Sequence, residues 1–422
     1  MLDITFIKEN PELVIDSMNN KGEKNVQLVQ QVIEKDEQWR QLVHQVDTLR
    51  AQSNKAAKQI GALMASGKKE EAQAIIQETS KSKDEVKELE DQLNVFAEER
   101  TSLLLRIPNV AHPSVPIGHS EEDNQVYGTW GSPDTQSWLK PHWDILEKHG
   151  WLDFERGVKV TGAGFPFYLG PLAQLQRALI HFFIDEANKA GYIEMQAPYF
   201  INEDSARGTG QIPDKEDMMY EIQRDAFFAI PTAEVPVTNF HRDEILSEEQ
   251  LPIRYVCHTP SWRREAGSYG KDVRGLNRLH QFDKVELVHF VKPEESYATL
   301  ELLRIHVESL LQKLGLAYQT LLMCTGDMGF TQTKKYDVEV WSPGQQRWLE
   351  VSSCSNFEAF QARRMQLRYR KGEKETEMVH TLNGSGLALP RVLSAIVETY
   401  QTENGRVKIP DILKKYIDQE YL

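Results

Sequence analysis

The sequence is poor in cysteine: its 422 residues include only three, Cys257, Cys324 and Cys354. They lie far apart and form no C-x-x-C pair, which argues against both a disulfide framework and a cysteine-rich zinc site, and fits a reducing compartment. Apolar runs of about 18 residues, the length of a membrane span, are also lacking. The N-terminal segment MLDITFIKENPE has no signal-peptide core. We therefore expect a soluble, cytoplasmic protein.

Positive charge is in deficit, with a formal net charge of −14. This argues against a broadly basic nucleic-acid-binding protein, so any contact with RNA must come from local patches. Two glycine-rich phosphate-binding motifs are missing as well, the G-x-x-x-x-G-K-[ST] loop and a G-x-G-x-x-G after a strand. If the chain binds a nucleotide, side chains must therefore hold its phosphates. The length leaves room for two or three domains.

Glycine and proline are almost absent from about residue 28 to 105, where apolar residues recur every seven positions. One heptad series includes Val32 and Val46, and a second includes Val86 and Leu93. The small polar segment ASGKKEE separates the two series. This pattern predicts an antiparallel helical hairpin, a self-contained coiled coil.

Positive charge gathers toward the tip of this predicted hairpin, and no acidic residue lies between Thr48 and Lys69. A single lysine there is most simply a solvated helix residue. Taken together as a patch, however, these cations would attract the phosphate backbone of an RNA. The predicted tRNA-binding residues are Arg50, Lys55, Lys58, Lys68 and Lys69.

The proline-rich segment RIPNVAHPSVPIG ends the second helix and is typical of a linker. Beyond it, short β-rich runs alternate with helices, which predicts an α+β fold with a mixed, mainly antiparallel sheet. We expect a helical arm at 1–107, a linker at 108–120 and a second domain at 121–422. The helices expected there are Leu172–Ala190, Glu294–Leu314 and Ala359–Tyr369, and the strands include Lys284–Val291, Tyr336–Val340 and Trp348–Val351.

The segment WRREAGSYGKDVRGLNRLHQFDKVE is the richest in chemistry. It holds Arg263, Arg264 and Glu265 in succession, a loop with two glycines, and then Arg278, Phe282 and Glu286 at a spacing of four. Arginine side chains form bidentate hydrogen bonds with phosphate, an aromatic ring stacks on a base, and carboxylates accept hydrogen bonds from amines. As strand, loop and strand, the segment predicts a hairpin that could hold ATP beside an amino acid. A solvated, salt-bridged hairpin is the plainer interpretation, but the pattern is unusually specific.

This hairpin resembles motif 2 of the class II aminoacyl-tRNA synthetases, and its sequence is most similar to that of the seryl-tRNA synthetase family. FYLGPLAQLQRALIHFFIDEANKAGYIEMQAPYF resembles motif 1, and NGSGLALPRVLSAIVETYQ, with Arg391, resembles motif 3. The HIGH and KMSKS signatures of class I synthetases are missing. The resemblance covers essentially the whole chain. It implies a class II antiparallel sheet flanked by helices, an N-terminal coiled-coil arm and, through motif 1, a homodimer.

The resemblance implies an ATP site in which Arg263 and Arg391 are catalytic. Arg263 would stabilise the charge that builds on the α-phosphate, Glu265 would accept from the adenine amino group, and Phe282 would stack on the base. Glu350 and Ser353 would hold Mg²⁺; since alternation pairs Glu350 with Ser352, we expect Ser353 to join it through a bend at the strand end. The full implied ATP site is Arg263, Arg264, Glu265, Phe282, Glu350, Val351, Ser352, Ser353 and Arg391.

The same resemblance implies L-serine as the substrate, with Glu234 of a T-A-E motif accepting its ammonium group. A site that pairs its polar groups with the substrate hydroxyl rejects alanine, since loss of the hydroxyl leaves those groups unpaired. The implied serine site is Thr232, Ala233, Glu234, Arg263, Glu286, Asn383 and Ser385.

The expected activity is ATP-dependent formation of seryl-adenylate, followed by transfer to tRNA(Ser); whether tRNA(Sec) is also charged stays open. The arm would hold the long variable region of the tRNA. Two rival functions are a relative that loads an amino acid onto a carrier protein and an inactive RNA-binding paralogue. The first lacks a long arm, and the second should have lost motif arginines or glutamates, all of which are present here.

Overall fold

A computed structural model describes residues 1–265 and 274–422. The chain divides into two compact units. The helical unit comprises Leu2–Asn19 and Glu23–Pro108, and the sheet unit comprises Met1, Asn20–Gly22 and Asn109–Leu422. The change of unit therefore falls between Pro108 and Asn109, at the start of the segment expected to be a linker.

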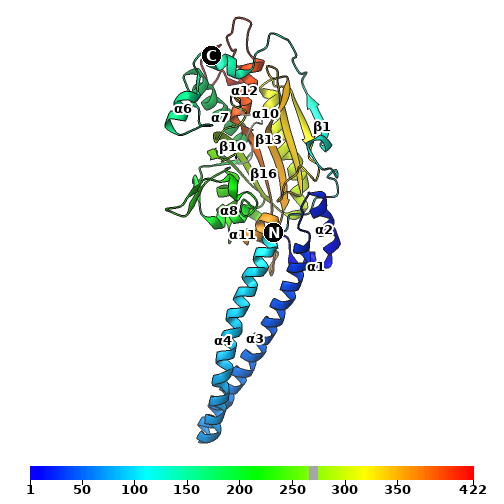
Figure 1. Ribbon diagram of the computed structural model, residues 1–422, viewed down its shortest axis with the longest axis vertical. Helices are drawn as coiled ribbons and strands as arrows, with labels where there is room; N and C mark the ends of the chain where they lie inside the picture. Colours follow the sequence, from blue (N-terminus) through cyan, green and yellow to red (C-terminus); the bar gives the residue numbers. More distant parts are fainter. Residues whose placement is uncertain (266–273) are drawn as a thin grey trace. The chain divides into compact units, whose positions relative to one another are not determined.

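Two long antiparallel helices dominate the helical unit (Figure 1). The turn between them contains Gly67 at a φ of +78°, a left-handed conformation that glycine adopts readily. Apolar side chains of the heptad series, including Val32 and Val46, are buried between the helices. The helical hairpin predicted from the seven-residue repeat is thus confirmed. The helices of this unit are α1 (Ile4–Glu9), α2 (Pro11–Asn20), α3 (Gln27–Ala65) and α4 (Lys69–Leu105).

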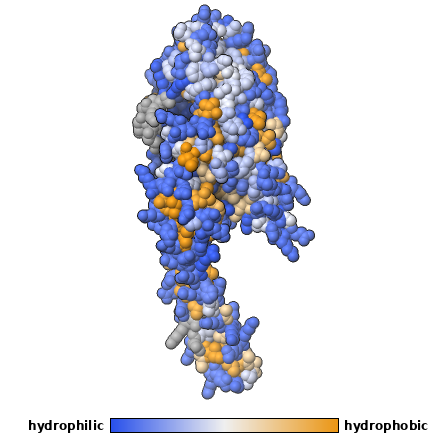
Figure 2. All heavy atoms as spheres, turned by 90° about the vertical axis from the view of Figure 1, so that its right-hand side faces the viewer, coloured by the Kyte–Doolittle hydropathy of each residue, from blue (hydrophilic) through white to orange (hydrophobic). Residues whose placement is uncertain are grey.

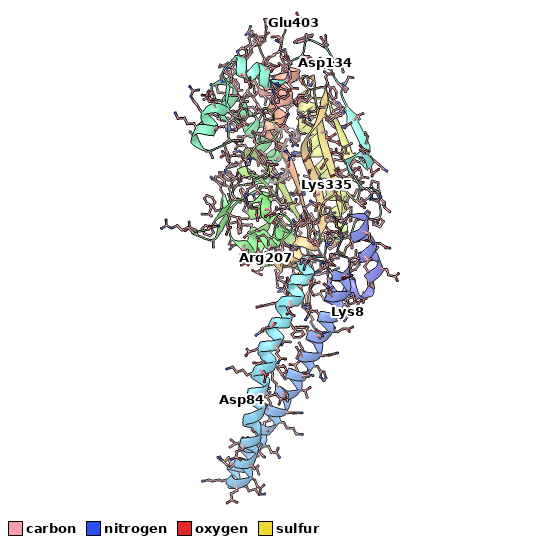
Figure 3. All side chains as sticks on the ribbon, in the orientation of Figure 1. Lys8, Asp84, Asp134, Arg207, Lys335 and Glu403 are labelled. Atoms are coloured by element: carbon pink, nitrogen blue, oxygen red, sulfur yellow. The ribbon has the colours of Figure 1, made fainter. Side chains whose placement is uncertain are left out.

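A buried carboxylate joins three of these helices at one end of the hairpin. Asp36 of α3 is fully buried and pairs with Lys8 of α1 at 3.2 Å, Arg40 of α3 at 2.8 Å and Arg100 of α4 at 2.9 Å; Lys8 is labelled in Figure 3. The Arg100 guanidinium also lies 4.2 Å from the ring centroid of Trp39. A buried charge is tolerated only when it is paired and hydrogen-bonded, so this cluster holds α1, α3 and α4 together.

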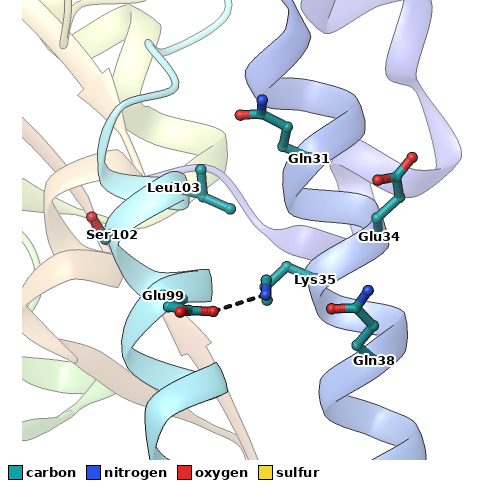
Figure 4. Close-up of a pocket in the computed structure, with 7 residues that line it drawn as sticks. All are labelled: Gln31, Glu34, Lys35, Gln38, Glu99, Ser102 and Leu103. Atoms are coloured by element: carbon teal, nitrogen blue, oxygen red, sulfur yellow. Dashed lines mark ion pairs between the residues drawn. The ribbon is translucent and has the colours of Figure 1, made fainter.

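A shallow depression lies between α3 and α4 near the same end (Figure 4). Lys35 of α3 crosses it to Glu99 of α4 at 2.8 Å. Its other lining side chains are mostly polar and half-buried or exposed. Exposed ion pairs of this kind contribute about 0–1 kcal/mol, and we assign the depression no chemistry.

The sheet unit is built on an eight-stranded sheet with the strand order β1-β11-β12-β13-β16-β10-β9-β4. Neighbouring strands pair antiparallel, except that β4 runs parallel to β9. The mainly antiparallel sheet and the α+β class expected from the sequence are therefore confirmed. The strands are β1 (Gln125–Trp130), β4 (Ile193–Met195), β9 (Ile253–Trp262), β10 (Gln281–Val291), β11 (Tyr318–Leu322), β12 (Lys334–Ser342), β13 (Arg347–Glu358) and β16 (His380–Ala388).

Helices cover both faces of this sheet. Against one face, α7 (Pro171–Lys189), α10 (Ser296–Lys313) and α12 (Leu389–Thr399) form the main core with side chains such as Val285 and Leu287 of β10 (Figure 1). Against the other face, α9 (Glu234–Thr238) and α11 (Phe360–Met365) form a second core with Val288 and Phe290. Odd- and even-numbered side chains of one strand thus serve opposite layers.

The remaining elements are short and flank this sheet. One prediction among them was wrong: the helix expected over Ala359–Tyr369 ends at Met365, since Gln366 adopts a left-handed φ of +54° and a strand begins at Arg368. The other elements are α5 (His142–Lys148), α6 (Phe154–Val160), α8 (Glu203–Thr209), β2 (Leu152–Asp153), β3 (Phe167–Tyr168), β5 (Phe200–Ile201), β6 (Glu221–Ile222), β7 (Phe227–Ala229), β8 (Ile245–Ser247), β14 (Arg368–Lys371), β15 (Glu375–Met378) and 3-10 turns at Glu121–Asp123, Glu216–Met218, Asn239–His241, Glu248–Gln250, Pro293–Glu295 and Asp411–Leu413.

The surface seen in Figure 2 is largely hydrophilic, with apolar side chains scattered over it in small groups. Among the helices of the described residues, none combines the length and the apolar character that crossing a membrane requires.

Candidate active site

Strand β10 forms one wall of the candidate site through simple alternation. Phe282, Lys284 and Glu286 line a cavity, whereas Val285 and Leu287, on either side of Glu286, are fully buried in the main core. β10 pairs antiparallel with β9 along its length, so the predicted pairing of two strands is confirmed. Most of the loop predicted between them, residues 266–273, lies outside the described residues.

The cavity has a volume of about 480 Å³, and its lining includes Leu276, Leu279 and Val351 of the main core. Its walls come from β10, β13 and β16, from the first turn of α12 and from the segment that leads into α9. Most of the predicted site residues meet there: Thr232, Glu234, Arg263, Glu265, Phe282, Glu286, Glu350, Val351, Ser352, Ser353, Asn383, Ser385 and Arg391.

Two predicted residues do not line the cavity. Arg264 follows the end of β9 with an exposed side chain, and its main-chain N–H donates to the Met218 carbonyl at 2.8 Å. Ala233 is fully buried in the second core, beside Val237. The matching tripeptides Arg263–Glu265 and Thr232–Glu234 therefore each contain one residue whose side chain does not line the cavity.

Glu286 is the most enclosed acid of the cavity, at 1% exposure. One carboxylate oxygen accepts from Asn383 Nδ2 at 2.9 Å, and the other from Thr232 Oγ1 at 3.3 Å and from Lys284 Nζ at 2.6 Å. Three donors suit an ionised carboxylate. Glu286 therefore fixes the side chains around it as well as lending the pocket negative charge.

Glu234 begins α9 and lies close to Glu286 in the same pocket. Its carboxylate Oε1 accepts from Gln361 Nε2 at 2.7 Å. Burial, and then the charge of Glu286, raise the pKa of Glu234 above its ordinary value, although Gln361, Lys284 and Lys215 oppose the rise. A cation bound in the pocket would therefore stabilise the ionised form of Glu234.

Two arginines occupy other parts of the cavity wall. Arg263 Nε donates to the Pro231 carbonyl at 3.2 Å, and its guanidinium lies 5.2 Å from the Phe282 ring centroid. Arg391, in the first turn of α12, donates from Nη1 to the Glu350 carbonyl at 2.7 Å and from Nε to the Asn277 carbonyl at 3.1 Å. Pro390 precedes it in that turn, where its missing N–H costs no hydrogen bond. Main-chain carbonyls therefore orient both guanidinium groups beforehand.

Glu265 lies at the rim of the cavity, 3.3 Å from Arg278. Its φ is +50°, which is uncommon for a residue other than glycine. Such backbone conformations persist where the surrounding structure holds them and concentrate at functional sites. The observation supports the sequence prediction that this carboxylate has a binding role.

The expected pairing of Glu350 with Ser353 is present, but its structural cause differs from the one predicted. Ser353 Oγ donates to Glu350 Oε1 at 3.0 Å. The strand does not bend at its end: β13 continues to Glu358, and a β-bulge at Val351 shifts its pairing with β12 by one residue. The bulge reverses the alternation, so Ser352 instead donates to the Ser385 carbonyl at 2.6 Å.

Several cavity residues were missed by the sequence reasoning, among them Lys284, Lys335 and Lys215. The alternation of Phe282 and Glu286 could have revealed Lys284. Lys335 of β12, labelled in Figure 3, lies 2.9 Å from Asp337; burial opposes its charge, but Asp337 and Glu350 raise its pKa above the ordinary value.

The cavity thus combines six cationic side chains with four carboxylates, among the residues that the structure describes around it. Glu234 and Glu286 lie close together, whereas Arg263 lies near Phe282 and Arg391 near Glu350. This arrangement can bind an amine beside a polyanion that carries a planar ring. The cations are Lys215, Arg263, Arg278, Lys284, Lys335 and Arg391, and the acids are Glu234, Glu265, Glu286 and Glu350.

The residues predicted to bind tRNA lie on the helical hairpin, at Arg50, Lys55 and Lys58 of α3 and at Lys68 and Lys69 around the start of α4. Among the side chains that the structure describes on this hairpin, two of them form ion pairs: Arg50 with Glu90 at 2.7 Å and Lys68 with Glu71 at 3.0 Å. The strip that lacks acids in the sequence is therefore partly neutralised by α4.

The fold and the cavity together define a class II aminoacyl-tRNA synthetase, because one antiparallel sheet brings the arginines and acids of motifs 2 and 3 into a single site. Residues 219–400 match the family model described as "tRNA synthetase class II core domain (G, H, P, S and T)". Residues 1–111 match the model of the "Seryl-tRNA synthetase N-terminal domain". The chain belongs to the seryl-tRNA synthetase family.

Known relatives extend over the whole chain. A serine–tRNA ligase of Salinibacter ruber is 54% identical over 418 residues, covering 99% of this chain and 98% of its own. One from Thermodesulfovibrio yellowstonii is 45% identical over 420 residues, covering 99% of both chains. The crystal structure of seryl-tRNA synthetase from Pyrococcus horikoshii complexed with ATP has a TM-score of 0.93 at 35% identity, covering 100% of this chain and 99% of that one.

Proposed function

We propose that this chain is a serine–tRNA ligase that activates L-serine with ATP to seryl-adenylate and transfers the seryl group to tRNA(Ser). The observation that carries the proposal is one cavity in which the acid pair Glu234 and Glu286 adjoins the anchored Arg263 and Arg391. Relatives named serine–tRNA ligase support it. So do structures of family members with ATP, from Pyrococcus horikoshii, and with AMP, from Naegleria fowleri.

The nucleotide would lie against Phe282, with its adenine near Glu265 and its phosphates between the two anchored arginines. Arg263 stabilises the α-phosphate as the serine carboxylate attacks it and pyrophosphate leaves. Such preorganised donors need not reorient during the reaction. Arg391 binds the leaving phosphates. No side chain has to abstract a proton from the attacking group, because a carboxylate is already ionised at neutral pH.

Serine would bind at the acidic end, with its ammonium group on Glu234 and its hydroxyl among Thr232, Asn383 and Ser385. These three side chains are each less than a tenth exposed. A substrate that lacks the hydroxyl forms no hydrogen bond with these buried groups, and we expect it to be rejected.

The paired oxygens of Glu350 and Ser353 fit Mg²⁺ carried by ATP. Mg²⁺ usually takes one or two protein oxygens and completes its shell with phosphates and waters. The described residues contain no cluster of three or more His, Cys, Asp or Glu placed to hold a metal ion, so the ion would arrive with the nucleotide. When bound, it would neutralise phosphate charge.

Serine-dependent exchange of pyrophosphate into ATP, assayed with each of the twenty amino acids, tests the activation step. We expect exchange with serine and little with alanine or threonine. Aminoacylation of tRNA(Ser) and tRNA(Sec) transcripts tests the acceptor. Analytical ultracentrifugation tests the homodimer that motif 1 implies. Absence of serine-dependent exchange in the folded protein would contradict the proposed function.

Glu234→Gln should raise the KM for serine roughly ten- to a hundredfold, because hydrogen bonds to charged groups contribute about 1.5–3 kcal/mol. The KM for ATP should stay within a factor of about two of the parent, since Glu234 lies outside the proposed nucleotide site beside Phe282. An unchanged KM for serine would remove Glu234 from ammonium recognition.

The pH dependence of serine binding should follow from the raised pKa of Glu234. Below this pKa the carboxyl group keeps its proton and attracts an ammonium group poorly, so serine binding should strengthen as pH rises through it. Binding should therefore release a proton. Calorimetry in buffers of different ionisation enthalpy measures this release, and Glu234→Gln, which has no proton to lose, should abolish it.

A further inference from the structure

Gln361 lies on α11, outside the three motifs, and its side chain is 1% exposed. Its Nε2 donates to Glu234 Oε1 at 2.7 Å and to the Thr209 carbonyl at 3.3 Å, while its Oε1 accepts from Thr381 Oγ1 at 2.7 Å. Turning the amide over would bring its oxygen against two acceptors. The three contacts therefore fix one orientation, with the NH₂ group toward Glu234.

The charges around Glu234 explain why such a donor is needed. Glu286 of β10 repels its ionised form, while Lys284 of β10 and Lys215, before the 3-10 turn at Glu216–Met218, attract it from a distance. Lys284 is engaged with Glu286 at 2.6 Å. Among the described side chains, Gln361 is the group that donates a hydrogen bond to Glu234, and it reaches Oε1 alone.

We propose that Gln361 is a positioning residue that holds Glu234 as an oriented carboxylate for the ammonium group of the substrate. This inference rests on the proposed function. An amide stabilises the carboxylate without neutralising it, so the negative charge remains available to the ligand. A lysine or arginine at the same place would compete with the substrate for that charge. Thr381 does not contact Glu234 through this network but donates a hydrogen bond to the Gln361 amide oxygen, and so fixes the orientation of the amide.

Gln361→Met removes the donor at nearly constant volume. Without it the pKa of Glu234 should rise further, because burial and Glu286 are then opposed less. We expect the KM for serine at pH 7 to increase about ten- to a hundredfold, with kcat and the KM for ATP changed by less than about threefold. The rise of serine affinity with pH should move to higher pH, so that alkaline buffer restores part of the affinity. Structural damage alone would not produce this recovery.

Gln30→Met is a matched control, because Gln30 of α3 donates to Glu34 at 2.8 Å and neither residue lines the cavity. It should leave the serine pH profile unchanged. Thr381→Val should shift the profile in the same direction as Gln361→Met by a severalfold smaller amount, and it decides the matter if Gln361→Met does not fold. An unchanged KM, or a KM raised equally at every pH together with a lower kcat, would overturn the role of Gln361. If the parent itself shows no serine-dependent exchange, the proposed function fails instead.

Discussion

Arg263→Ala is expected to lower serine-dependent pyrophosphate exchange by a factor on the order of 10²–10³, the usual effect of removing one preorganised donor to transition-state charge. The side chain is half-buried, anchored to the Pro231 carbonyl at 3.2 Å and packed near Phe282. Its loss should remove little core packing, so the melting temperature should change by only a few degrees. The rate should fall much more than binding of either substrate, because the contact strengthens as charge develops.

Arg156→Ala provides a control for Arg263→Ala, since Arg156 is an exposed arginine that pairs with Asp153 away from the cavity. It should exchange pyrophosphate at the parental rate. Single-turnover measurement of adenylate formation would separate the chemical step from substrate binding. Near-parental exchange in a folded Arg263→Ala protein would show that another cation serves the α-phosphate; Lys215, Lys284 and Lys335 also line the cavity.

Shortening the helical hairpin should separate the two steps of the reaction. Deleting residues 49–89 and closing the helices with a short glycine-containing turn keeps the Asp36 cluster and the Lys35–Glu99 pair. Pyrophosphate exchange should remain within about twofold of the parent, because the cavity is lined by residues of the sheet unit. Aminoacylation of tRNA(Ser) should fall by roughly tenfold or more, since binding to phosphate depends on the basic side chains removed.

Salt dependence identifies which basic side chains contribute. Glu90 and Glu71 pair with Arg50 and Lys68, and we choose the other three predicted residues, Lys55, Lys58 and Lys69, for charge reversal. Replacing all three by glutamate should weaken tRNA binding. It should also flatten the plot of log affinity against log salt by roughly 0.7–0.9 for each phosphate that the protein no longer neutralises. Parental charging by the shortened protein would make the hairpin an assembly element rather than a tRNA-binding one.

The parts that the sequence predicted correctly are those governed by local periodicity. The heptad series specified the hairpin, alternation placed Phe282 and Glu286 on one face of β10, and Pro390 indicated the start of α12. The resemblance to the class II motifs then identified most of the predicted residues that line the cavity. None of these inferences required knowledge of how distant strands pair.

The parts that were missed depend on tertiary pairing. Nothing local to Val351 indicates a bulge, which arises from the register of β13 against β12. Gln361 is far in sequence from Glu234, and its role follows only from the packing of α11 beside the pocket. The helix that should have reached Tyr369 ends early because this tyrosine is buried in the second core at 1% exposure, as part of a strand. Packing of this kind routinely overrides local propensity.

The Asp36 cluster has a consequence for how the helical hairpin moves. In α3, the buried residues Leu28, Val29 and Val32 lie at the end that holds the three paired cations, whereas Gln52–Ala65 has no buried residue. Local opening costs least where few apolar contacts must be broken. Amide hydrogen exchange should therefore be slow at Val32 and become progressively faster toward Ala65. Asp36→Asn should speed exchange most at the slow end. The hairpin would then present its basic side chains on a segment that fluctuates locally while its other end stays folded.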